Sequence, residues 1–209
     1  MVHLLAHCSI HRLGTLTMLP EQGRGLLSIA RAAIARALNI AYRSESDEHA
    51  PWLQELGACF VTLMQEGKLR GCIGSLEAQR SLLMDVKRNA VSAALHDPCF
   101  APLLTAEFDD THIEISLLSS RLAMLVQDEA DALAQLRPGI DGIVFECGCY
   151  RSTFLPQVWQ ELSQPHQFLA MLKRKAGLPA DFWAEGIKLS RYTVTKWREV
   201  EDMEEYLNG

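Results

Sequence analysis

The sequence lacks the paired cysteines that metal sites and redox motifs use. Its six cysteines, at positions 8, 59, 72, 99, 147 and 149, include no CxxC pair, and scattered thiols are typical of a reducing compartment. No apolar run approaches the roughly 20 residues needed to cross a bilayer. The opening segment 1–8 has no basic stretch and contains two histidines, so it makes a poor signal peptide. We therefore expect a cytoplasmic protein.

The sequence also lacks an excess of positive charge. Its formal net charge is -6, and proteins that bind nucleic acid without regard to sequence usually carry a positive excess. A spaced aromatic platform for stacking bases is missing as well. Basic residues do gather between positions 173 and 198, ahead of an acidic tail. Nucleic-acid binding is therefore disfavoured, while a local anion site stays open.

No internal repeat or low-complexity segment divides the chain, which at 209 residues and 48% hydrophobic content suits one large domain or two lobes. Apolar periodicity and breakers predict helices and strands in mixed order rather than strict alternation. The helices are expected over 20–42, 81–96, 128–136, from 156, and 165–175; the strands over 59–64, 69–74, 111–117, 140–147, 149–155 and 189–200. Strands joined by hairpins indicate an α+β fold with a mostly antiparallel or mixed sheet flanked by helices.

The segment 69–76, Leu-Arg-Gly-Cys-Ile-Gly-Ser-Leu, is the central candidate site. Strand alternation predicts that Leu69 and Ile73 face the core, with Arg70 and Cys72 on the opposite side. A guanidinium beside a thiol favours the thiolate, which is the form that attacks or binds a ligand. The two glycines around the thiol, at 71 and 74, would let backbone or ligand approach it closely.

The register of the preceding hairpin decides where this thiol points. A three-residue turn with Gly67 in the left-handed conformation pairs Gln65 with Leu69 and places Thr62 opposite Cys72 on the less apolar face. A two-residue turn would shift the register and move the thiol among aliphatic side chains. We prefer the three-residue turn.

Further candidates come from other segments. In the strand 111–117, His112 and Glu114 share the polar face and are candidate partners of the thiol, although an ordinary outer face explains them as well. The predicted catalytic set is Cys72, Arg70, His112 and Glu114, with ligand contacts from Thr62, Gly71, Ile73, Gly74 and Gln157. Near the N-terminus, His3, His7, Cys8 and His11 suggest a metal site, but no second ligand pair with zinc spacing follows, so a frayed terminus is the simpler interpretation. We expect no metal and no cofactor.

Several motifs together resemble the AMMECR domain family, which is called protein A of the AmmeMemoRadiSam system in prokaryotes. They are LRGCIGSL (69–76), NAVSAALHDPCFAPL (89–103), EISLLS (114–119), GIDGIVF (139–145), FLPQVW (154–159) and KAGL (175–178), and their shared order makes the match specific. The resemblance implies an α+β fold with a larger and a smaller lobe around a cleft, and partnership with a radical-SAM protein and a Memo-type protein. This chain has Cys99 where the family often has arginine, which puts an anion-binding role at that position in doubt.

These observations predict an N-terminal extension (1–18), one AMMECR-type domain of two lobes (19–202) and an acidic tail (203–209). Two functions stay open. In the first, the protein is an accessory component that binds a ligand, a peptide or its radical-SAM and Memo-type partners at the LRGCIG motif. In the second, it is an enzyme with Cys72 as nucleophile, although no Cys/His signature supplies a base. A structural alternative makes Cys72 a buried strand residue with glycine neighbours that serve packing.

Overall fold

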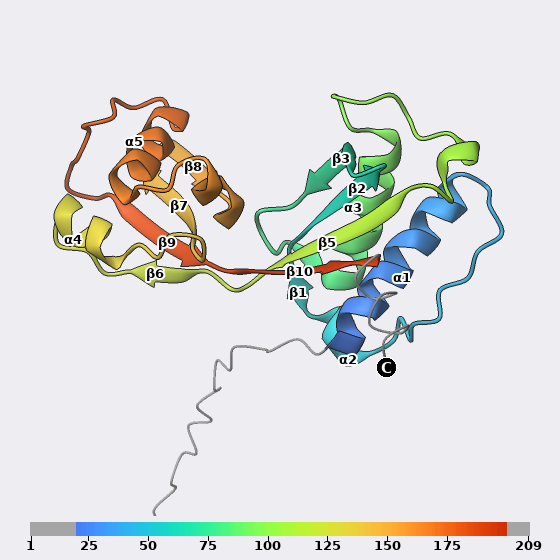
Figure 1. The fold of residues 1–209 in the computed structure, drawn as a ribbon. Coiled ribbons are helices and arrows are strands. Elements are labelled where there is room, and N and C mark those ends of the chain that lie inside the picture. Colours follow the sequence, from blue (N-terminus) through green and yellow to red (C-terminus); the bar gives the residue numbers. More distant parts are fainter. Residues whose placement is uncertain (1–19, 200–209) are drawn as a thin grey trace, which may run out of the picture.

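The structure is a computed structural model that describes residues 20–199, and it has the predicted α+β architecture (Figure 1). Every strand pairing is antiparallel. Two four-stranded sheets each carry their own hydrophobic core, and they form a large lobe and a small lobe. Within residues 20–199 no helix is long and apolar enough to cross a membrane.

The large lobe is a sheet with helices on one face. Its strands are ordered β10 (Val194–Arg198), β5 (His112–Leu118), β2 (Cys59–Gln65) and β3 (Lys68–Gly74), and helices α1 (Pro20–Ala37) and α3 (Leu82–Leu95) pack on it. The alternation in β2 and β5 turns Val61, Leu63, Ile113 and Ile115 toward these helices, where all are fully buried. Short elements complete the lobe: α2 (Pro51–Gln54), β1 (Leu56–Gly57), β4 (Arg80–Ser81) and η1 (Thr105–Glu107).

The small lobe is built around a second sheet. Its strands are ordered β6 (Leu122–Met124), β9 (Lys188–Tyr192), β7 (Gly142–Cys147) and β8 (Tyr150–Phe154), with α4 (Glu129–Gln135), η2 (Pro156–Gln160) and α5 (Pro165–Lys175). The ring of Trp159 stacks on Phe168 at a centroid distance of 3.8 Å, and both side chains are buried. Aromatic and aliphatic packing thus supplies this core.

Two neighbouring strands run through both lobes and join them (Figure 1). β5 continues into β6, and β9 continues into β10. At the crossing point Ser119 N–H donates to the Thr193 carbonyl (2.9 Å), and Thr193 N–H donates to Ser119 Oγ (3.0 Å). The single strand predicted over 189–200 is therefore wrong: Thr193 interrupts it because the chain changes sheets there.

The β2–β3 hairpin corrects the predicted turn. Glu66 and Gly67 both have positive φ, 49° and 72°, which makes a two-residue turn with Gln65 opposite Lys68. A register shift after Leu63 then restores the predicted pairing of Thr62 with Cys72. The prediction that Leu69 faces the core is wrong, because before the shift it lies opposite Met64 and is 51% exposed.

Helix α1 is shorter than predicted. It ends at Ala37 rather than near 42, because Asn39 adopts a left-handed conformation (φ 60°) and the Ile40 N–H bonds back to the Ala35 carbonyl. The candidate metal ligands His3, His7, Cys8 and His11, and the acidic tail, lie outside the described residues.

Candidate functional site

The two glycines of the LRGCIG strand serve close packing. A Cβ atom on Gly71 would lie 2.3 Å from the carbonyl oxygen of Ala93 in α3, and one on Gly74 would lie 2.2 Å from the ring of Phe60. Both distances are far below a normal van der Waals contact. Gly71 therefore lets α3 approach the sheet, and Gly74 makes room for the Phe60 ring.

Cys72 is half-buried, and its polar atoms already have partners in the chain. Its Sγ lies 3.4 Å from Thr62 Oγ1, which is its only polar side-chain contact among the described residues. Its N–H donates to Asp97 Oδ2 at 2.7 Å. The other oxygen of Asp97 accepts from Cys99 N–H at 2.9 Å. The Cys72 N–H is thus occupied by Asp97 and is not available to an oxyanion. The loop after α3 covers this edge of the sheet.

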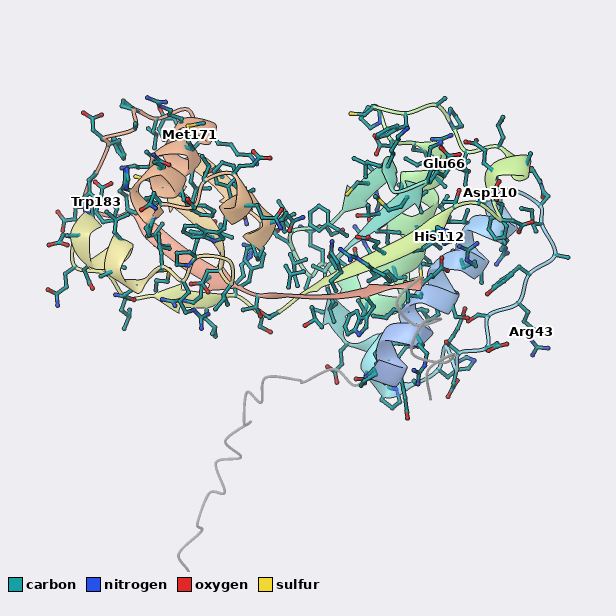
Figure 2. The ribbon with its side chains drawn as sticks, viewed as in Figure 1. Arg43, Glu66, Asp110, His112, Met171 and Trp183 are labelled. Carbon is teal, nitrogen blue, oxygen red and sulfur yellow. The ribbon has the colours of Figure 1, made fainter. Side chains whose placement is uncertain are left out.

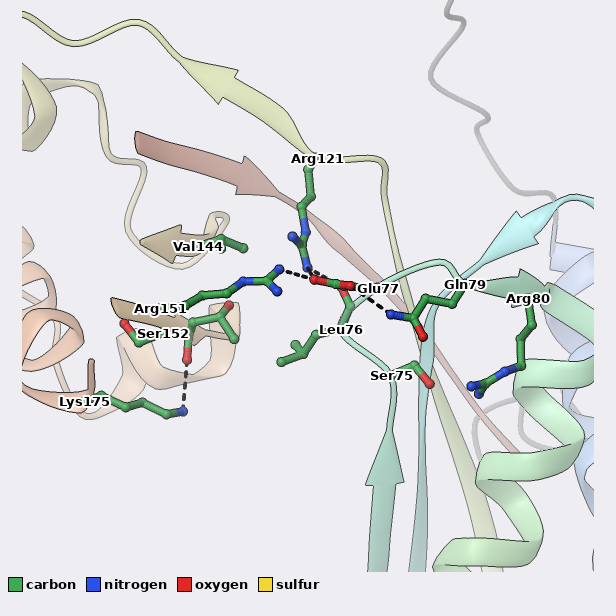
Figure 3. Close-up of a pocket in the computed structure, with 11 residues that line it drawn as sticks. Ser75, Leu76, Glu77, Gln79, Arg80, Arg121, Val144, Arg151, Ser152 and Lys175 are labelled. Carbon is green, nitrogen blue, oxygen red and sulfur yellow. Dashed lines mark hydrogen bonds and ion pairs between the residues drawn. The ribbon is translucent and has the colours of Figure 1, made fainter. Parts of the chain in front are cut away.

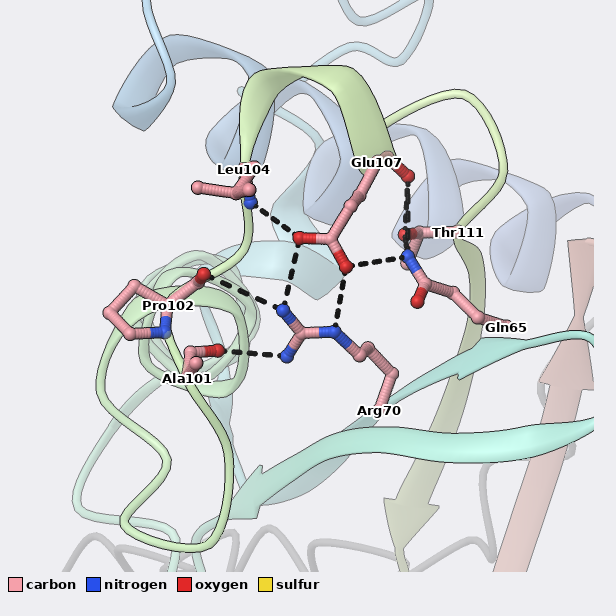
Figure 4. Close-up of polar contacts among 7 residues, drawn as sticks. All are labelled: Gln65, Arg70, Ala101, Pro102, Leu104, Glu107 and Thr111. Carbon is pink, nitrogen blue, oxygen red and sulfur yellow. Dashed lines mark hydrogen bonds and ion pairs between the residues drawn. The ribbon is translucent and has the colours of Figure 1, made fainter.

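Arg70 forms an ion pair with Glu107 rather than with the thiol (Figure 4). Its Nε and Nη2 donate to the two carboxylate oxygens at 3.0 and 3.1 Å, and Nη1 donates to the Ala101 carbonyl at 2.8 Å. This bidentate hydrogen bonding, with a bond from Leu104 N–H, lowers the pKa of Glu107 to about 2. Among the described residues, the Arg70 guanidinium therefore makes no hydrogen bond to Cys72, contrary to the prediction.

Glu114 shares a row of the sheet with the thiol but is held from its other side. Thr62 lies between them, paired with Cys72 on β3 and with Glu114 on β5. The Glu114 carboxylate forms ion pairs with Lys196 (3.0 Å) and Arg198 (2.9 Å) of β10. The structure confirms the shared face, while the carboxylate is directed to the cations of the next strand.

The remaining predicted residues do not complete a catalytic group. His112 begins β5 opposite Met64 and is exposed (Figure 2). Ile73 packs against the large-lobe core, and Gln157 lies exposed on η2 of the small lobe. Within the described part of the chain, no three His, Cys, Asp or Glu side chains are placed to hold a metal ion.

An open volume lies instead between the lobes, directly after the motif (Figure 3). This interlobe cavity measures about 500 Å³. Its large-lobe wall is the segment 75–80, which begins with the last two residues of LRGCIGSL, and Arg121 contributes from the crossing point. The small lobe supplies Val144, residues 151–153 and Lys175.

A buried carboxylate fixes the large-lobe wall of this cavity. Asp85, in the first turn of α3, is fully buried and accepts hydrogen bonds from Ser75 Oγ (2.7 Å) and Arg80 Nη1 (2.9 Å). It also accepts from the N–H of Cys59 at 2.9 Å and from the amide of Asn89 at 3.0 Å. Four donors satisfy the buried charge, so Ser75 and Arg80 are held in place.

The match to known proteins covers both lobes. The AMMECR1 family model matches residues 27–197. The chain belongs to the AMMECR1 family. Similar curated proteins include Protein MJ0810 of Methanocaldococcus jannaschii, 35% identical over 87% of this chain and 92% of that protein. A protein of Methanothermobacter thermautotrophicus is 38% identical over 86% of this chain and 95% of its own length.

A solved structure supports the fold. The crystal structure titled as uncharacterized protein PH0010 from Pyrococcus horikoshii is 32% identical and superimposes with a TM-score of 0.72, covering 86% of this chain and 92% of that one. Sequence reasoning missed Arg121, Arg151 and Glu77 of this AMMECR1 protein as site residues. No sequence signal joins them, because segments far apart in the chain meet only when the lobes come together.

Proposed function

We propose that this AMMECR1-family protein is an accessory, ligand-binding component that acts with a radical-SAM protein and a Memo-type protein, and that its ligand occupies the interlobe cavity. The observation that carries the proposal is that Cys72, Arg70 and Glu114 are each engaged by a different partner. A nucleophilic thiol needs a base within hydrogen-bond reach, and within residues 20–199 the polar side-chain contact of this thiol is the Thr62 hydroxyl alone.

The cavity favours binding over bond making. It is concave and lies between two lobes, which is where small-molecule sites often occur, and most of the residues that line it are polar or charged. The longer motif LRGCIGSL (69–76) contributes to it through its last two residues, Ser75 and Leu76. The glycines of the strand, and its edge bonded to Asp97, hold that wall against α3. The motif thus shapes the cavity, and the thiol itself is outside its lining.

The test compares two identical substitutions in the same motif. Leu76→Trp fills the cavity wall, whereas Leu69→Trp adds the same side chain at an exposed position outside it. Each variant is co-purified with a radical-SAM and a Memo-type protein of the same organism, and retained small molecules are measured by mass spectrometry. We expect Leu76→Trp to lose the ligand, while Leu69→Trp and Cys72→Ser keep the ligand and the activity of the partner system.

The catalytic alternative makes the opposite prediction. It is favoured if Cys72→Ser binds ligand and partners normally but abolishes the activity of the system. It is also favoured if the Cys72 thiol is alkylated much faster than the exposed Cys99 thiol, which is an internal control in the same chain. Normal ligand retention by Leu76→Trp would contradict the proposal directly.

A further inference from the structure

The interlobe cavity concentrates positive charge in an acidic protein. Four basic side chains line it, from Arg80, Arg121, Arg151 and Lys175, and Glu77 is the single acidic residue of its lining. The chain as a whole has a net charge of -6. The buried carboxylate of Asp85 neutralises Arg80. Arg151 is paired with Glu77 and, at 3.1 Å, with Glu146. Arg121 and Lys175 are therefore the cations of the lining that no carboxylate of the described residues approaches within 3.5 Å.

Among the residues that the structure describes, two of these cations have only neutral acceptors within 3.5 Å. Lys175 Nζ donates to the Thr153 carbonyl at 3.0 Å and lies 5.0 Å from the centre of the Phe154 ring. Arg121 Nη2 donates to the Leu76 carbonyl at 2.7 Å, while its distance to Glu77 Oε1 is 3.7 Å. Carbonyl oxygens satisfy donors without cancelling their charge. An oxyanion makes the stronger, charge-assisted bond.

A carboxylate of the chain already occupies part of this cation cluster (Figure 3). Glu77 reaches from the large lobe to form an ion pair with Arg151 of the small lobe, and it accepts from the Gln79 amide at 3.0 Å. The hydrogen bond from Arg151, followed by that from Gln79, lowers the pKa of Glu77. Glu77 is therefore ionised at neutral pH. The cluster recognises a carboxylate by geometry as well as by charge.

The ion pair of Glu77 with Arg151 is exposed enough for a ligand to displace the Glu77 carboxylate. Its side chain is 37% exposed, and that of Arg151 is 44% exposed. Ion pairs this exposed contribute little free energy, because water solvates the separated charges well. A ligand that brings its own oxyanion, and that contacts Lys175 as well, makes bonds that Glu77 leaves unmade.

We infer that the interlobe cavity is an oxyanion site, in which a carboxylate or phosphate group of a small ligand binds Arg121, Arg151 and Lys175 in place of the Glu77 carboxylate. This inference rests on the proposed function, because it names the chemical class of the ligand at the same site. Arg151 and Lys175 belong to the small lobe, and Glu77 belongs to the large lobe. The exchange therefore replaces a contact between the lobes with one made through the ligand.

The test is calorimetric titration of the full chain with inorganic phosphate and, separately, with succinate, at constant ionic strength. Glu77→Gln removes the internal competitor, so we expect it to bind roughly three- to fivefold more tightly than wild type. Arg151→Gln and Lys175→Gln each remove a charged donor, and we expect roughly tenfold weaker binding. Lys68→Gln, at the exposed tip of the β2–β3 hairpin, is the matched control and leaves affinity unchanged.

The two anions identify the source of the oxyanion. Tighter binding of phosphate assigns a phosphate-bearing ligand, and tighter binding of succinate assigns a carboxylate. The inference is overturned if Glu77→Gln shows no saturable binding of either anion, or if Lys68→Gln weakens binding as much as Lys175→Gln.

Failure of this inference is distinct from failure of the proposed function. If Leu76→Trp loses a ligand identified by mass spectrometry as neutral or cationic, the cavity binds a ligand and only its anionic class is wrong. If phosphate or succinate binds as expected but Leu76→Trp retains the system's ligand, the oxyanion site exists and the proposed function is wrong.

Discussion

The LRGCIG strand and the interlobe cavity lie next to each other in the chain but differ in how their polar groups are satisfied. On the strand, Arg70 has the Glu107 carboxylate, and the Cys72 N–H has Asp97. In the cavity, Arg121 and Lys175 have backbone carbonyls as their close acceptors. A closed network stabilises a fold, whereas cations whose hydrogen bonds go to neutral carbonyls can still make charge-assisted bonds to a ligand. The most recognisable motif therefore organises the site, and less recognisable residues supply its binding groups.

The largest expected effect comes from the buried carboxylate of Asp85, which holds the cavity wall that follows the LRGCIG strand. Asp85→Ala removes the acceptor of the buried Cys59 N–H and frees Ser75 and Arg80 of the cavity wall. We expect a loss of about 3–4 kcal/mol in the free energy of unfolding, measured by urea denaturation. Asp110→Ala, at an exposed position of the same lobe, is the control and changes stability by less than about 0.5 kcal/mol. Equal effects would mean that the Asp85 network is not structural.

The next effect tests whether the motif glycines serve packing. Gly71→Ala forces a Cβ atom against the backbone carbonyl of Ala93, which cannot rotate away. We expect a loss of about 2–3 kcal/mol in the free energy of unfolding. The matched control is Gly25→Ala in helix α1, where the nearest atom is Ser46 Oγ at 3.3 Å and alanine favours the helix. If Gly71→Ala is as stable as wild type, close packing does not explain this glycine.

A smaller effect depends on pH and isolates the Arg70 network. The pKa of Glu107 is lowered to about 2 from an ordinary value of 4.5, so the folded state holds the ionised form. Its contribution to stability is complete above pH 4.5 and is lost as the pH falls toward 2. We expect Glu107→Gln to cost about 2 kcal/mol at pH 6, since solvent screens part of the interaction.

The measurement is urea unfolding of wild type and Glu107→Gln from pH 6 down to pH 3. The stability difference narrows on acidification, because the unfolded wild type takes up the proton first. Glu185→Gln, exposed in the small lobe, gives a difference near zero at every pH. If the difference in the free energy of unfolding between wild type and Glu107→Gln stays constant with pH, Arg70 does not stabilise the ionised form of this carboxylate.

The smallest expected effect is in the cavity. Arg151→Gln breaks the ion pair with Glu77, but both side chains are well exposed, so we expect a stability change below about 1 kcal/mol. Differential scanning calorimetry against Lys68→Gln measures it. A large loss of stability would mean that the ion pair holds the two lobes together. The cavity would then resemble the Arg70 network in being structural.

Local patterns predicted much of this fold. The alternation of β5 placed Ile113 and Ile115 in the core, and the hairpin placed Thr62 opposite Cys72, because a period of two survives in any antiparallel sheet. The position of Leu69 was predicted wrongly, because the sequence alone did not select the two-residue turn. The register shift between Leu63 and Met64 compensates for that turn only beyond Leu69.

The site was less predictable than the fold. Strand alternation correctly put Glu114 on the face of Cys72, but it carries no information on where a long side chain finds its partner. Arg70 forms an ion pair with Glu107 of η1, and Glu114 forms ion pairs with Lys196 and Arg198 of β10. The cavity residues Glu77, Arg121 and Arg151 are brought together by the lobe arrangement, which no local pattern encodes. Only the clustering of basic residues after position 173, which includes Lys175, hinted at an anion site.

The double-stranded crossing between the lobes also sets an order of events during synthesis. All of the small lobe, from β6 to β9, is inserted in the chain between β5 and β10. The whole small lobe is therefore synthesised before the last edge strand of the large sheet. That strand carries Trp197, whose indole occupies the space above Gly23 of α1. Glu199 directly follows the strand and forms an ion pair with Arg31 of α1. The large lobe is sealed last, by residues that reach it only after the inserted lobe has been made.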